Sequence, residues 1–177
     1  MKKYCIFFLT LVIITLTGLG FSGVFPSAEV GAEKEYLRIH IRADSNDGSA
    51  QAVKYLVRDD VVDFLTPLVA EYETQEQAVE GVRAHLTQIA AVAARVLERN
   101  GFYYGATAEL TVESFPTRVY GEYTLPAGEY AALILRLGKG EGDNWWCVVY
   151  PPLCFAGESG NVVYQSKIAQ IIRKWKK

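Results

Sequence analysis

The chain has 177 residues, half of them hydrophobic, and a formal net charge of −2 at pH 7. This length suits one domain with appended segments rather than several domains. The charge is uneven: residues 33–166 carry 11 Lys/Arg and 19 Asp/Glu, whereas residues 167–177 carry five Lys/Arg and no acid. Because phosphate binding needs a basic face, the acidic body argues against nucleic acid as a partner.

The first 32 residues have the anatomy of a secretory signal. Lys2 and Lys3 precede an apolar run over residues 4–19, and small residues at 30–32 offer a cleavage site. The uncharged run over residues 4–28 is also long enough to cross a hydrocarbon core of roughly 30 Å as an uncleaved anchor. Either way, we expect an extracytoplasmic domain over residues 33–166, followed by a basic tail over residues 167–177.

Hydrophobic periodicity predicts a strand, two helices and then about four strands. Alternation over residues 36–43 is typical of a half-buried strand. The first helix follows, with Asp47 or Ser49 as its cap and Pro67 ending or bending it. Thr74 and Gln77 then match the capping box of a second helix that stops at residue 100.

A period of two returns in the second half of the chain. The predicted strands are residues 106–113, 119–125, 130–137 and 145–150, with the last two completing a meander. A strand follows the glycine-rich residues 138–144, so they indicate a hairpin loop and not a phosphate loop. We therefore predict an α+β fold, in which an antiparallel sheet of four to five strands carries two helices on one face.

Cys147 and Cys154 flank a Pro151-Pro152 pair that would bend the chain back on itself. In an exported domain, two thiols this close favour a disulfide, the alternatives being buried free thiols or a reactive thiol. A thiol nucleophile would need a neighbouring histidine. The two histidines, His40 and His85, occupy ordinary positions on a strand and beside a helical apolar stripe. Two histidines give no metal-binding spacing either, so we expect no metal, no cofactor and no small-molecule substrate.

Aromatic residues and prolines concentrate in two stretches near residues 115–120 and 145–152. Trp and Tyr are enriched where proteins contact partners, although any of these side chains can instead belong to a core. Neighbouring strand residues point to opposite faces, so the two tryptophans cannot share one core. The candidate partner-binding residues are Phe115, Pro116, Tyr120, Trp145, Trp146, Pro151 and Pro152.

The basic tail has helical spacing, with Ile168, Ile171, Ile172 and Trp175 on one stripe. This stripe either packs on the sheet, or the helix lies on an anionic membrane surface. In the second case the contact residues are Lys174, Trp175, Lys176 and Lys177.

Three stretches resemble those of a known family. They read L-R-I-H-I-R-A-D-S-N-D followed by A-V-K-Y-L-V-R-D-D within residues 37–60, S-F-P-T-R-V-Y-G-E-Y-T-L-P-A-G-E-Y at 114–130, and G-K-G-E-G-D-N-W-W-C-V-V-Y-P-P-L-C-F at 138–155. The sequence resembles the stage II sporulation protein R family of endospore-forming bacteria. It departs at residues 43–48, which read A-D-S-N-D-G where the family usually reads A-N-S-D-S.

The resemblance implies a secreted intercellular signal and not an enzyme. Such a protein is made in the forespore and exported into the space between the forespore and mother-cell membranes. There it activates a membrane-embedded aspartic protease of the mother cell, which processes the sigma-E precursor. The alternative hypothesis is an extracytoplasmic, thiol-dependent cell-wall or peptide hydrolase that uses Cys147 or Cys154. A disulfide between them would remove its nucleophile.

Overall fold

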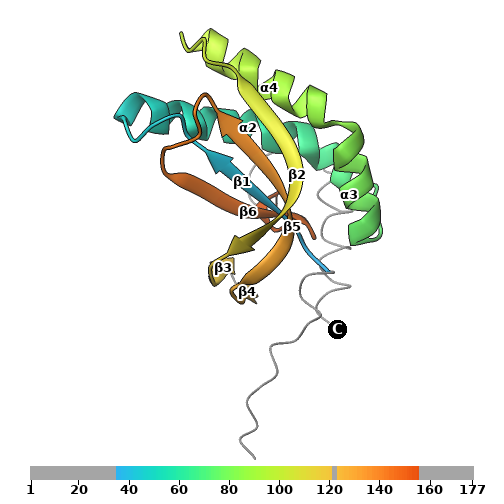
Figure 1. Ribbon diagram of the computed structural model, residues 1–177. Coiled ribbons are helices and arrows are strands. Elements are labelled where there is room, and N and C mark those ends of the chain that lie inside the picture. The colour runs from blue at the N-terminus through green and yellow to red at the C-terminus, as the bar shows by residue number, and fades with distance from the viewer. Residues whose placement is uncertain (1–34, 121–122, 156–177) are drawn as a thin grey trace, which may run out of the picture. The chain divides into compact units, whose positions relative to one another are not determined.

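The computed structural model describes residues 35–120 and 123–155 (Figure 1). The signal or anchor segment and the basic tail, with Lys174, Trp175, Lys176 and Lys177, lie outside the described residues. Within the described ranges, no helix is both long enough and apolar enough to cross a membrane.

A four-stranded sheet in the order β2-β5-β1-β6 forms the centre of the fold (Figure 1). Strand β1 (Leu37–Arg42) is parallel to β5 (Gly128–Leu137) and antiparallel to β6 (Asn144–Tyr150). Strand β2 (Ala106–Phe115) is antiparallel to β5. The α+β class is confirmed, but the sheet is mixed and not antiparallel throughout. Because β1 lies between β5 and β6, the glycine-rich connection is a crossover and not a hairpin.

Three helices pack on one face of this sheet: α2 (Gly48–Val69), α3 (Gln75–Ala84) and α4 (Leu86–Arg99). Their apolar stripes meet Leu37, Ile39 and Ile41 of β1, which are at most 1% exposed. Apolar burial of this kind is the main favourable term in folding. This face therefore holds the main hydrophobic core.

The helix ends differ in part from the prediction. The Thr74 cap is confirmed, since Thr74 Oγ1 accepts a hydrogen bond from the Gln77 amide at 3.2 Å. Asp47 occupies the N-cap position of α2, but its carboxylate accepts from the Ser45 hydroxyl instead of the helix amides. Pro67 lies inside α2, which ends two residues later.

The predicted second helix is two helices, separated at His85. This residue has φ −111° and ψ 9°, outside the helical region. Its Nδ1 lies 2.7 Å from the Gly81 carbonyl oxygen. A side chain that hydrogen-bonds nearby backbone competes with regular helical structure, which accounts for a break that hydrophobic spacing does not reveal.

The other face of the sheet carries a second, smaller core. It consists of Phe115, Leu125, Tyr130, Ala132, Ile134 and Val148. Two short strands, β3 (Arg118–Tyr120) and β4 (Tyr123–Leu125), pair in the place of the single strand predicted at residues 119–125. Because side chains from this β3-β4 pair join the second core, β1 is buried on both faces and not half-buried as predicted.

Candidate functional site

Three of the predicted partner-binding residues, Phe115, Tyr120 and Trp146, meet on the face of the sheet opposite the helices. Phe115 ends β2, Tyr120 ends β3 and Trp146 lies in β6. With Arg38 of β1 and Tyr130 of β5 they form a group that we call the aromatic cluster. The fold thus gathers residues that are far apart in the sequence.

Arg38 lies at the centre of the aromatic cluster and is fully buried. Its Cζ is 4.0 Å from the ring centroid of Phe115 and 4.8 Å from that of Tyr130. Its Nη2 donates a hydrogen bond to the Tyr120 hydroxyl at 3.0 Å. Among the described residues its Nε and Nη1 have no hydrogen-bond partner. Stacking on aromatic faces therefore compensates for part of the cost of burying this charge.

His40 and Arg42 extend the same face of β1, and both contact one carboxylate, that of Glu113. His40 Nδ1 lies 2.8 Å from Glu113 Oε2, and Arg42 Nη2 pairs with Glu113 Oε1. The His40 ring also packs on Trp146, with ring centroids 5.4 Å apart. The Glu113 carboxylate of β2 therefore contacts two side chains of β1, His40 and Arg42, next to the aromatic cluster.

The accessible layer above this cluster comes from residues 116–120. Val119 is 67% exposed, and Pro116 is also exposed. The Arg118 Cζ lies 4.1 Å from the Trp146 ring centroid. Phe115, at 3% exposed, is a core residue and so cannot contact a partner directly. We call Pro116, Arg118 and Val119 the hairpin surface.

The amino-acid sequence of this chain matches known proteins. Residues 33–159 match the family model of stage II sporulation protein R. The chain is also 35% identical to Stage II sporulation protein R of Bacillus subtilis (strain 168), over 161 residues that span 88% of this chain and 72% of that protein. The chain belongs to the stage II sporulation protein R family. The resemblance seen in the sequence is therefore confirmed, and the protein is a sporulation protein. No solved structure matches it.

In this sporulation protein the remaining aromatic candidate, Trp145, lies on the helix side of β6 and packs against the main core. The prediction that the two tryptophans occupy opposite faces is confirmed. Arg58 of α2 places its Cζ 5.7 Å from the Trp145 ring centroid and 5.0 Å from that of Tyr55. Sequence reasoning missed Tyr55 and Arg58, although their spacing of three residues puts them on one side of a helix.

Cys147 and Cys154 form a disulfide, as predicted. Cys154 Sγ also accepts a hydrogen bond from the Val148 amide at 2.9 Å. The disulfide fastens the short helix η2 (Leu153–Phe155) to β6. Pro151 and Pro152, which lie between the two cysteines in the sequence, are buried and so are not accessible to a partner. With both sulfurs in the bond, neither is the thiolate that a hydrolase would use as its nucleophile. In the described part of the chain, no group of His, Cys, Asp and Glu could hold a metal ion.

Proposed function

We propose that this sporulation protein is an exported signal. It binds the extracytoplasmic side of a membrane-embedded aspartic protease of the mother cell and activates it, leading to processing of the sigma-E precursor. Family membership supports the role in sporulation, and the anatomy of residues 1–32 supports export to the space between the two membranes.

The observation that carries the binding role is the hairpin surface above the aromatic cluster. Val119 is a large apolar side chain left 67% exposed, beside an Arg118 that stacks on Trp146. Interface hot spots are enriched in Trp, Tyr and Arg and depend on well-packed surroundings. Buried Arg38 and its ring contacts hold this surface in place before binding, which lowers the entropy lost on association.

Activation, as distinct from binding, requires that the signal prefer the active state of the protease. A ligand with equal affinity for two states shifts neither population, however tightly it binds. The proposal therefore predicts that the protein increases precursor processing and does not simply form a complex with the protease.

The test is co-expression of the exported protein with the candidate protease and the sigma-factor precursor. Val119→Asp is expected to abolish processing because it places a carboxylate in the interface. As a surface change it alters the free energy of unfolding by about 0.5 kcal/mol or less. Tyr103→Asp is the matched control, since Tyr103 is an aromatic residue 84% exposed between α4 and β2, outside the hairpin surface.

Two outcomes would contradict different parts of the proposal. Normal processing with Val119→Asp would show that the interface lies away from the hairpin surface. If the wild-type protein does not increase precursor processing in the reconstituted system, the signalling function itself is wrong.

A further inference from the structure

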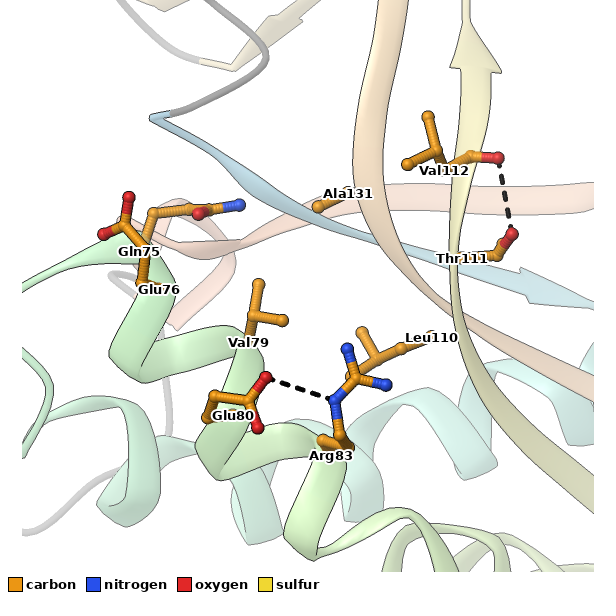
Figure 2. Close-up of a pocket in the computed structure, with 9 residues that line it drawn as sticks. All are labelled: Gln75, Glu76, Val79, Glu80, Arg83, Leu110, Thr111, Val112 and Ala131. Carbon is orange, nitrogen blue, oxygen red and sulfur yellow. Dashed lines mark hydrogen bonds and ion pairs between the residues drawn. The ribbon is translucent and has the colours of Figure 1, made fainter.

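A cavity of about 390 Å³ lies on the helix side of the sheet, between α3, β5 and β2 (Figure 2). Its apolar walls come from Val79 of α3, Leu110 and Val112 of β2, and Ala131 of β5. Val79, Leu110 and Ala131 also pack against the main hydrophobic core. Val112 lies two residues after Leu110 and so on the same face of the strand, yet it is 64% exposed. The cavity is therefore a part of the core face that the three helices leave uncovered.

The polar residues at the rim of this cavity do not select a charged occupant. Glu76, Glu80 and Arg83 line it from α3. Figure 2 shows that Glu80 already pairs with Arg83, whose Nε lies 3.2 Å from the Glu80 carboxylate. Glu76 also has an interaction of its own. What the cavity offers an occupant is therefore its apolar walls, with room for one or two large side chains.

The described chain ends at the same end of the sheet as the cavity. Tyr150, the last residue of β6, is paired with Leu37 of β1, and Leu37 is paired with Ala131. Ala131 is in turn paired with Val112 of β2. These four residues form one row across the sheet, three strand spacings or roughly 14 Å wide. The helix η2 follows Tyr150, and its Cys154 packs against the main core, on the face that holds the cavity.

The chain that follows η2 is long enough to reach the cavity. Residues 156–166 number 11 and can span up to roughly 36 Å when extended, which is more than twice the width of that row. Residues 167–177 come next, and their apolar side chains recur at i, i+3, i+4 and i+7, the spacing of an amphipathic helix. These side chains belong to Ile168, Ile171, Ile172 and Trp175. A helix of 11 residues is marginal alone in water, so its apolar stripe needs a surface.

We propose that the apolar stripe of residues 167–177 docks in the cavity between α3, β5 and β2. There it contacts Val79, Leu110 and Val112, while the five Lys/Arg of the segment face solvent. Tethering favours this docking, because a short flexible linker gives the attached segment an effective concentration in the mM range. The segment before β1 is a poorer occupant, since residues 33–35 are all charged. The inference does not depend on the proposed function.

Amide hydrogen exchange of the full exported protein, measured without lipid, tests the docking. The amides of residues 167–177 are expected to exchange at least tenfold more slowly than those of a synthetic peptide of the same sequence, because exchange then requires undocking. Val112→Asn replaces an apolar contact by an uncharged polar one of similar size and is expected to speed this exchange by about tenfold. Val119→Asn is the matched control, because Val119 is 67% exposed but lies on β3, and it is expected to leave the exchange unchanged.

A reciprocal variant separates undocking from unfolding. Trp175→Asn is expected to speed exchange of its own segment and to shift the amide resonances of Val79 and Leu110. Exchange in β1 and β5 should stay at the wild-type rate in every variant, which shows that the domain remains folded.

The proposal is overturned if residues 167–177 exchange as fast as the free peptide, or if Val112→Asn and Val119→Asn behave alike. It is also overturned if slow exchange appears only when anionic vesicles are added, because the stripe then binds a membrane. Slow exchange that is lost on dilution would overturn it as well, because the cavity then holds the segment of a second copy.

Discussion

At the scale of single residues, Arg38 is the side chain whose burial differs most from the prediction. Alternation along residues 36–43 puts it on the polar side of a half-buried strand, yet it is fully buried. The rings that surround it come from Phe115, Tyr120 and Tyr130, at least 77 positions further along the chain. A period of two can tell which residues share a face, but not what covers that face.

We expect Arg38→Met to be tolerated, because it keeps an unbranched side chain and removes a charged group whose nitrogens Nε and Nη1 have no hydrogen-bond partner among the described residues. Replacing buried charges by apolar groups of similar volume is often neutral or stabilising, so the free energy of unfolding should stay within about 1 kcal/mol of wild type or rise. Arg38→Ala also leaves a cavity and should lose roughly 2–4 kcal/mol. Urea denaturation of the two variants distinguishes these expectations. If Arg38→Met and Arg38→Ala lose equal free energy of unfolding, ring stacking outweighs the desolvation of the guanidinium.

At the scale of elements, the sequence located the strands of the sheet to within a few residues and identified the α+β class. It could not reveal that β1 is parallel to β5, because strand order depends on contacts between distant segments. It also missed the helix break at His85, which depends on one local hydrogen bond to Gly81. Of the candidate site, residue type alone picked out Tyr120 and the two tryptophans. The basic partners of the two tryptophans, Arg58 and Arg118, became visible only through the fold.

The disulfide belongs to this scale because it joins two elements, β6 and η2. Its closed loop is short, with a sequence separation of 7. The entropic stabilisation should therefore stay below the roughly 3 kcal/mol expected for a 15-residue loop, at about 2 kcal/mol. We expect a Cys147→Ala, Cys154→Ala double variant to lose about this much free energy of unfolding in urea denaturation without reductant. Reductant should remove most of the difference in free energy between the wild type and the variant.

Alkylation tests the disulfide directly. Intact mass of the native exported protein after alkylation should show both sulfurs unmodified, and two added alkyl groups would disprove the bond.

At the scale of the whole molecule, the loop after β1 organises the far end of the sheet. The Gly142 amide donates to the Ala43 carbonyl at 2.8 Å, and the Lys139 amide donates to the Asp44 carboxylate at 2.8 Å. A Cβ at Gly142 would collide with the Ser45 carbonyl oxygen, so the close approach requires glycine. The stretch that departs from the usual family sequence thus fastens the β5-β6 crossover to the start of α2.

Lys54 of α2 completes this connection and is 1% exposed. Its Nζ donates to Gln51 Oε1 at 2.7 Å and to the Asp143 carbonyl oxygen at 3.0 Å. Burial lowers the pKa of Lys54 below its ordinary value of 10.5, and the charge of Asp143 opposes this shift only in part. The unfolded chain therefore holds this proton to a higher pH than the folded chain does.

From that difference we predict how global stability depends on pH. Between the lowered pKa of the folded state and 10.5, the unfolded state binds more protons at Lys54, so the contribution of this residue to stability rises with pH. Burial raises the pKa of Tyr36, Tyr72 and Tyr104, which has the opposite effect because the unfolded tyrosines ionise first. Comparison with Lys54→Met cancels the tyrosine contribution. We compare urea denaturation of the wild type and Lys54→Met from about pH 8 upward. The free energy of unfolding of the wild type should rise relative to that of Lys54→Met as the pH increases toward 10.5. A difference that is constant over this range would show that Lys54 keeps its ordinary pKa in the folded protein.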